Sequence, residues 1–370
     1  MGTFEGQGPI LSIRHKNSGY VFNLSGKYSQ VESFLEISND VFTAALFVKQ
    51  ALSGVYPNFD EAIKLNEVQN FFKFADERFP IPFYLQGISY PGSVVRSYGA
   101  YIYEKMLPTD IKSALESLPE SSSLILDLDE RSAAIPWELA SNGRNFLHLK
   151  FSCGRKPLAS EVHVSSKAFG QWRLLIVANP TGDLPETLNE ANYIISQLRD
   201  LQKLRIARFG YEITKKHFLD LIRNGEYHII HYTGHSAEYT DSEKSHLLFR
   251  DGPCYASDIQ AVLSENSPLM VFANSCLSAH QLQSGTTSLA DSFLNAGVTS
   301  YVGALWPVSD QGSAMVASDF YRLVLHGNTI GEALRKARLT SFGKWGYHDH
   351  VWSSFILFGD PQSRLFINND

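Results

Sequence analysis

From about residue 172 onward, short apolar runs alternate with longer segments whose apolar residues recur at helical spacing. This alternation is typical of βαβ units, in which parallel strands are joined by helices that cover both faces of a sheet. Several of the runs are rich in Ile and Val, as strands buried on both faces require. The pattern therefore predicts an α/β fold with a mostly parallel sheet.

The same part of the chain predicts individual elements. The expected strands are 172–178, 204–209, 227–233, 269–273, 298–304 and 354–358. A helix is expected over 186–201, just after Pro185, because its apolar residues fall on one side at helical spacing. Another is expected over 310–326, where Asp310 caps the start and Gly327 follows the end.

The first 170 residues are less regular. The expected elements are a hairpin over 11–24, helices over 31–52, 61–77 and 98–118, strands over 124–128 and 146–151, and a turn over 135–139. Prolines 80, 82 and 91 interrupt the pattern, so we expect a boundary near residue 92. This gives an N-terminal α+β extension, 1–92, and a larger unit, 93–370. A linker over 156–171 divides that unit into 93–165 and 166–370.

Composition excludes several classes of protein. Lys plus Arg number 32 and Asp plus Glu 38, so the net charge of −6 offers no basic face for nucleic acid. The three cysteines are far apart, which fits a reducing, cytoplasmic location better than a disulfide framework. The N-terminus lacks a signal-peptide pattern and the apolar runs are too short for a bilayer, so no membrane insertion is expected.

Several catalytic motifs are absent from the sequence, among them the P-loop, the G-x-G-x-x-G dinucleotide fingerprint, G-x-S-x-G and H-E-x-x-H. His231 and His235 are four residues apart, but the run around His231 predicts a strand. A strand separates such residues by roughly 13 Å, too far for one metal ion. The cluster over 348–350 is interpreted as a solvated turn. No metal site is expected.

One pair of residues, a histidine and a cysteine, fits a catalytic role. His235 follows one predicted buried strand and Cys276 follows another. In open parallel sheets, reacting groups meet beyond the carboxyl ends of the strands. A histidine within hydrogen-bond reach converts a cysteine to thiolate near neutral pH. The backbone N–H groups of Gly234 and Cys276 would then stabilise a developing oxyanion.

Each of these residues also has a structural interpretation. Free cysteine often behaves as a small buried hydrophobe, and a histidine at a strand end is often held by structural hydrogen bonds. Cys153 and Cys254 lack a histidine on a matching strand end and serve as internal controls. From residue types alone, both interpretations of the pair stay open.

A set of ordered blocks adds to this signal. HYTGHSAEY, LMVFANSCLSA, SLADSFLNAGVTSYVGALWPVSD, FYRLVLHGNTIGEALRKAR and WSSFILFGDP follow one another, preceded by LILDLDERSAAIPWELA and RLLIVANPTGDLPE. Together they resemble the CHAT domain, a cysteine peptidase module related to caspases and separase. The resemblance covers about Val94 to Asn368 and leaves the first ninety residues outside.

The resemblance implies a caspase-like three-layer sandwich without a metal or organic cofactor. In it His235 would be the general base and Cys276 the nucleophile, attacking a peptide carbonyl through a thioester. Asn274, Trp306 and Asp310 would line the substrate pocket. Each of these three residues also has a structural alternative. Asn274 would form hydrogen bonds with backbone groups at a strand end, Trp306 would pack in the core, and Asp310 would cap its helix.

The chain departs from the family pattern in three places. Ser236 replaces the usual glycine after the histidine, and Ser275 stands where alanine is common before the cysteine. Relatives that cleave after Arg or Lys can carry an acid where this chain has Asn274. We therefore expect an apolar or small polar residue before the scissile bond.

The resemblance also implies a protein substrate, and such relatives are often regulatory proteases in antiviral defence or programmed death that cut a gasdermin-like pore former or another effector. A protein activator is a further expected partner, and the extension, 1–92, would recruit it or the substrate, or pack against the core. The alternatives are a silent scaffold that keeps the fold, and a thiol acyltransferase or amidase that uses the same dyad.

Overall fold

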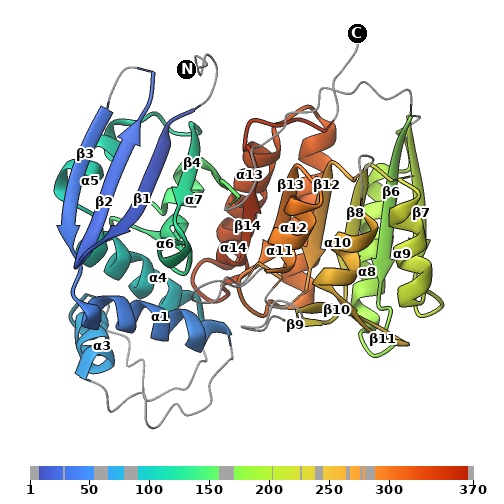
Figure 1. Cartoon of the computed structure of the whole chain (residues 1–370), viewed down its shortest axis with the longest axis horizontal. Helices are drawn as coiled ribbons and strands as arrows, with labels where there is room; N and C mark the ends of the chain where they lie inside the picture. The colour runs from blue at the N-terminus through green and yellow to red at the C-terminus, as the bar shows by residue number, and fades with distance from the viewer. Residues whose placement is uncertain are drawn as a thin grey trace.

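The computed structural model describes residues 8–27, 30–53, 66–78, 91–157, 171–201, 203–225, 227–237, 245–263, 267–275, 278–279 and 288–365. Eleven strands in this described part form one sheet (Figure 1). Their spatial order is β3 (Gln30–Glu36), β2 (Gly19–Ser25), β1 (Ile10–Lys16), β4 (Ser123–Leu128), β5 (Ser152–Arg155), β14 (Phe355–Phe358), β13 (Ser300–Ala304), β12 (Met270–Asn274), β8 (Ile229–Thr233), β6 (Trp172–Ala178) and β7 (Leu204–Phe209).

Most of the sheet consists of two parallel blocks that run in opposite directions, and the antiparallel strands β2 and β3 extend it at one edge. Strands β7, β6, β8, β12 and β13 are parallel to one another. β14 runs antiparallel to β13 but parallel to β5, which in turn is parallel to β4, and β4 to β1. The carboxyl ends of β6, β8, β12 and β13 therefore share one edge of the sheet.

Helices cover both faces of the sheet, so the predicted three-layer α/β architecture is confirmed. One face carries α8 (Pro185–Leu198), α12 (Asp310–Leu325) and α13 (Ile330–Trp345). The other carries α9 (Lys215–Arg223), α10 (Ala256–Val262) and α11 (Leu289–Asn295). Side chains alternate between the faces along each strand. In β6, for example, Leu174 packs on the face that carries α8, α12 and α13, and Leu175 packs on the face that carries α9, α10 and α11.

The first ninety residues extend the same sheet. The predicted hairpin is present, with β1 antiparallel to β2, and β1 also pairs with β4 through partners such as Ile10 and Ile125. Helices α1 (Asn39–Ser53) and α3 (Asn66–Arg78) follow. The Ser53 hydroxyl donates to the carbonyl of Leu305, 3.4 Å away, just past β13. The sheet thus continues across residue 92, and the division into domains stays a prediction.

Two predicted helices are wrong in extent. The helix expected over 31–52 begins only at Asn39, because β3 forms an edge strand antiparallel to β2 with alternating exposure. The helix expected over 98–118 consists of three pieces, since Pro108 cannot continue a helix. These are α4 (Pro91–Tyr101), a π-helix (Ile102–Met106) and α5 (Thr109–Ser117).

The strand predicted over 146–151 is wrong in type. Its apolar and polar residues alternate over too short a run to distinguish a strand from a helical turn. The structure has the turn α7 (Leu147–Lys150), closed by Lys150 N donating to the Phe146 carbonyl at 2.9 Å, and β5 starts after it. The remaining short elements are α6 (Glu130–Ala133), a 3-10 turn (Trp137–Leu139), α14 (Val351–Ser354), and a separate sheet of β9 (Ser236–Ala237), β10 (His246–Phe249) and β11 (Gly252–Tyr255). The predicted linker lies almost wholly outside the described residues.

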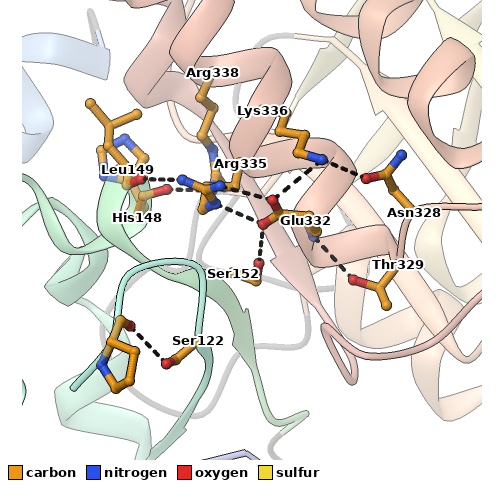
Figure 2. Close-up of polar contacts among 11 residues, drawn as sticks. Ser122, His148, Leu149, Ser152, Asn328, Thr329, Glu332, Arg335, Lys336 and Arg338 are labelled. Carbon is orange, nitrogen blue, oxygen red and sulfur yellow. Dashed lines mark hydrogen bonds and ion pairs between the residues drawn. The ribbon is translucent and has the colours of Figure 1, made fainter.

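Helix α13 is bound by polar contacts to the block of the sheet that contains β5 and β14 (Figure 2). Arg335 donates to the carbonyl of Leu149 at 3.0 Å and forms an ion pair with Glu332, which also accepts from the Ser152 hydroxyl at 2.8 Å. One turn further, the buried Arg338 donates to the carbonyl of Phe355 at 2.6 Å. These contacts hold β5 and β14 against the helix.

Candidate functional site

The candidate site lies at the carboxyl edge of the β6 to β13 block. The chain leaves β6 for β7 on one side and returns through α9 to β8 on the other side. The order of strands therefore reverses between β6 and β8, and ligands of open α/β sheets bind beyond the strand ends at such a point. The loops that follow β6 and β8 are the elements that meet there.

His235 follows β8 by two residues and is held through its backbone. The Tyr232 hydroxyl lies 2.7 Å from the carbonyl oxygen of His235 and 2.8 Å from that of Leu248. Leu248 N also donates to the His235 carbonyl at 2.9 Å. These bonds position the backbone, while the imidazole stays 43% exposed. The side chain is therefore open to a substrate.

Gly234 is needed for this close arrangement. A Cβ added at this position would lie 2.9 Å from the Tyr232 hydroxyl oxygen and 3.0 Å from Cδ of Pro180. Real Cβ atoms essentially never come so close to other heavy atoms. Any larger residue would displace the hydroxyl that holds His235. The oxyanion role of the Gly234 N–H stays a prediction.

The structure brings Asp183 to His235, a contact that the sequence analysis missed. Oδ2 of Asp183 lies 3.0 Å from Nε2 of His235. The Thr181 hydroxyl donates to the other carboxylate oxygen. Thr181 and then His235 lower the pKa of Asp183, so its carboxylate is charged at neutral pH. The only signal in the sequence was an acidic residue in the loop that follows the predicted strand 172–178, and the sequence does not show that this strand is the neighbour of the histidine strand.

The loop that carries Asp183 is tightly built. Asn179, which follows β6, has a φ of 54°, a left-handed conformation that asparagine adopts more readily than most residues. Its side-chain oxygen accepts from Leu184 N at 2.9 Å, and its carbonyl accepts from Gly182 N at 3.1 Å. Its own N–H donates to the carbonyl of Thr233 at 3.0 Å, which ties this loop to the end of β8.

Cys276 lies outside the described residues, so its predicted role stays a prediction. The last described residues before it are Asn274, which ends β12, and the buried Ser275. Asn274 pairs in register with Thr233 of the parallel strand β8. His235 and Cys276 therefore each come two residues after a matched pair of strand ends.

The two control cysteines are buried. Cys153 is on β5 and Cys254 on β11, with 2% and 0% of their surface exposed. Burial raises the pKa of both thiols well above the ordinary range. Neither will form a reactive thiolate near neutral pH.

Asn274 is bound to a buried carboxylate. Its amide nitrogen lies 2.9 Å and 2.8 Å from the two carboxylate oxygens of Glu190, a residue of α8 that is only 2% exposed. The same carboxylate accepts from the Thr233 hydroxyl at 2.8 Å and lies 3.0 Å from Nε2 of His231. Glu190 thus links the ends of β8 and β12, the two strands that lead to His235 and Cys276. The partner of Asn274 is a side-chain carboxylate and not the backbone groups that the structural alternative named, and the pocket role of Asn274 stays a prediction.

The two histidines that are four residues apart face different partners. His231 is fully buried and points to Glu190, whereas His235 is exposed and points to Asp183. Within the described ranges, no group of three or more His, Cys, Asp or Glu side chains is arranged to hold a metal ion.

The other two predicted pocket residues lie beyond β13. Trp306 is fully buried and its ring stacks on His350, with centroids 6.2 Å apart. Asp310 is the first residue of α12. A cavity of about 700 Å³ opens between α8 and α12, lined among others by Glu190 and by Gln311, next to Asp310. The substrate roles of Trp306 and Asp310 stay predictions.

The cluster over 348–350 is only in part the solvated turn that the sequence predicted, because His348 is exposed but its two neighbours are partly buried. The side chain of Asp349 is 22% exposed and that of His350 is 14% exposed. The Asp349 carboxylate accepts from Val351 N at 2.9 Å and from the Ser309 hydroxyl at 3.1 Å. The adjacent His350 imidazole and these hydrogen bonds lower the pKa of Asp349 to about 2. Asp349 and His350 are therefore partly buried, and the Asp349 carboxylate accepts a hydrogen bond from the first residue of α14.

Comparison with solved structures identifies the class of fold. The chain is similar to the Arg-specific cysteine proteinase gingipain R (RgpB), with 14% identity and a TM-score of 0.50, over 73% of this chain and 68% of that one. It is also similar to separase in the Saccharomyces cerevisiae separase–securin complex, with 14% identity and a TM-score of 0.54, over 95% of this chain but only 30% of that one. At these identities the likeness shows a caspase-type fold.

The sequence identifies the family. The CHAT domain model matches residues 96–360, so the chain belongs to the CHAT domain family, and the resemblance stated above is confirmed. No curated protein matches the chain significantly. Of the helices that the structure describes, none has the length and apolar character needed to cross a membrane.

Proposed function

We propose that the chain is a cysteine endopeptidase that cleaves a partner protein with His235 and Cys276. The observation that carries this proposal is the registered pairing of β8 and β12, whose ends each precede one of the two residues by two positions. The CHAT family and the caspase-type fold support the same class of chemistry. An exposed imidazole beside an ionised carboxylate is a suitable general base.

The proposed reaction has two stages. The imidazole takes the proton from the Cys276 thiol, and the sulfur attacks the carbonyl carbon of the scissile peptide bond. The C–N bond then breaks, the imidazolium gives its proton to the leaving amine, and a thioester remains. Water, deprotonated by the imidazole, attacks the thioester and the C–S bond breaks. The imidazolium returns its proton to the sulfur, and the new carboxylic acid loses its proton to solvent. The N–H groups of Gly234 and Cys276 would bind the oxyanion at each stage.

We propose an apolar or small polar residue before the scissile bond. Asn274 carries no charge, and its amide is bound to the carboxylate of Glu190. Neither Asn274 nor Glu190 therefore offers a free negative charge to an arginine or lysine side chain. The natural substrate would be an effector such as a gasdermin-like pore former, cut in the cytoplasm during defence or programmed death. The resemblance to regulatory proteases of the CHAT family supports this assignment.

The alkylation rates of the three cysteines between about pH 5 and 9 test the proposal without a substrate. Peptide mass spectrometry resolves the three sites, and wild type is compared with His235→Ala. Cys276 alone should react well below the free-cysteine pKa of about 8.5, and His235→Ala should abolish that reactivity. The buried Cys153 and Cys254 should stay slow in both proteins. An equally slow Cys276 would contradict the dyad.

A variant series then tests turnover. Cys276→Ala should abolish cleavage of a protein substrate, whereas Cys153→Ala and Cys254→Ala should retain it. Retained cleavage in Cys276→Ala would exclude the proposed nucleophile. If a small acyl donor protects the Cys276 thiol from alkylation and peptides do not, the result would instead indicate an acyltransferase or amidase.

A further inference from the structure

We propose that Asp183 is a positioning residue that holds His235 in the tautomer with its proton on Nε2, so that Nδ1 takes the proton of the Cys276 thiol. This inference rests on the proposed function and assigns the two ring nitrogens their roles. It follows from the 3.0 Å contact between Oδ2 of Asp183 and Nε2 of His235.

The chemistry of the two groups determines the tautomer. A neutral imidazole has one N–H and one lone pair, whereas an ionised carboxylate only accepts hydrogen bonds. Nε2 of His235 must therefore carry the hydrogen, and Nδ1 keeps the lone pair. Within the described part of the chain, Asp183 is the one hydrogen-bond partner of this ring. Nδ1 is thus the nitrogen that can act as a base.

The loop holds Asp183 in place before any substrate arrives. Thr181 binds one carboxylate oxygen and leaves the other for His235. The left-handed Asn179 closes the loop through Leu184 N and anchors it to Thr233. The loop and the histidine are therefore both fixed to the end of β8. Backbone contacts, and not only flexible side chains, hold the Asp183 carboxylate near the His235 imidazole.

Charge supports the same role. When His235 accepts the thiol proton it becomes an imidazolium, and a carboxylate on its far nitrogen stabilises that charge. Other ionisable side chains near these loops have partners of their own: Tyr232 binds the His235 carbonyl, Glu212 accepts from Gly210 N, and Arg250 stacks over Tyr211. None of these side chains bonds to the imidazole, so Asp183 is the group to test.

The tautomer is measured directly by ¹⁵N NMR of the histidine-labelled full chain, with the His235 signals assigned by their loss in His235→Ala. In wild type, neutral His235 should carry its proton on Nε2. Asp183→Glu should preserve this signature, and Asp183→Asn should give a mixture of tautomers. A wild-type ring protonated on Nδ1, or no change in Asp183→Asn, would overturn the proposal.

The pH profile of Cys276 alkylation measures the consequence for the thiol. In Asp183→Asn the rate near pH 6 should fall about 3- to 10-fold, a modest effect because both side chains are partly exposed, while the rate near pH 9 should not change. The matched control is Asp220→Asn, an exposed aspartate paired with Arg223 at 2.9 Å on α9, which should leave the profile unchanged.

The outcomes separate the two proposals. If Cys276 reactivity depends on His235 but Asp183→Asn has the wild-type profile, the positioning role fails and the dyad stands. If Cys276 shows no dependence on His235, the proposed function fails together with the proton step. In that case the NMR spectra still report whether Asp183 sets the tautomer.

Discussion

At the scale of single residues, the position of His235 depends on the preceding residue being a glycine. Gly234 lies where a Cβ would press on the Tyr232 hydroxyl and on Pro180. That hydroxyl holds the carbonyl of His235. The smallest residue therefore permits the contact that positions the proposed base.

We predict that Gly234→Ala destabilises the protein by about 1 to 3 kcal/mol, the usual cost of overpacking, and slows alkylation of Cys276. Chemical denaturation and the alkylation assay measure the two effects. Gly343→Ala is the matched control, because a Cβ there in α13 meets nothing within 4 Å. The control should be neutral or stabilising by up to about 1 kcal/mol. Equal stabilities of the two variants would contradict the steric argument.

The residues of the site differ in how far the sequence predicts them. Gly234 and His235 are found from a local pattern, a buried strand followed by a glycine and a histidine. Asp183 is far from His235 along the chain, and their contact depends on β6 and β8 being neighbours. Only the pairing of strands reveals it, and a single sequence does not determine that order.

At the scale of elements, one carboxylate connects a helix to two strands. Glu190 of α8 accepts from Thr233 at the end of β8 and from Asn274 at the end of β12. It also contacts the buried His231 within β8. The spacing of the two strand ends, and with it the spacing of the residues that follow them, therefore depends on α8.

We predict that Glu190→Ala lowers the free energy of unfolding by about 2 to 4 kcal/mol, because it leaves several buried polar groups without their partner. Glu186→Ala, an exposed change on the same helix, should stay within about 0.5 kcal/mol of wild type. Urea denaturation measures both. A loss for Glu190→Ala no larger than that of the control would show that water replaces the carboxylate at no cost.

At the scale of the whole molecule, the sheet is continuous although the sequence predicts two units. The six strands and two helices predicted after residue 172 are present, because each of these strands is a short apolar run and each helix is amphipathic, whereas α9, α10, α11 and α13 were not predicted. The pairing of β1 with β4 joins residues more than a hundred positions apart, such as Ile13 and Leu128. No local pattern specifies such a partner, so the way the extension joins the sheet could not be predicted.

A buried lysine links the extension to the rest of the molecule. Lys49 of α1 is 3% exposed, and its ammonium donates to the carbonyl of Ala134 at 2.9 Å. The buried ion pair of Glu138 and Arg155 lies close enough to influence its charge. Burial, with a smaller contribution from Arg155, lowers the pKa of Lys49 from about 10.5 to about 7.

This shift makes the stability of the whole chain depend on pH. Between pH 7 and 10.5 the unfolded chain keeps the Lys49 proton that the folded chain has lost, so stability rises with pH by up to about 1.4 kcal/mol per unit. We predict that Lys49→Met lowers this slope relative to wild type, as measured by urea denaturation between pH 7 and 8.5, where the ionisation of unfolded cysteines is common to all the variants compared. The exposed Lys16→Met should keep the wild-type slope. If Lys49→Met keeps it as well, the charged ammonium is accommodated in the fold, and the junction between the extension and the rest of the sheet is not sensitive to pH.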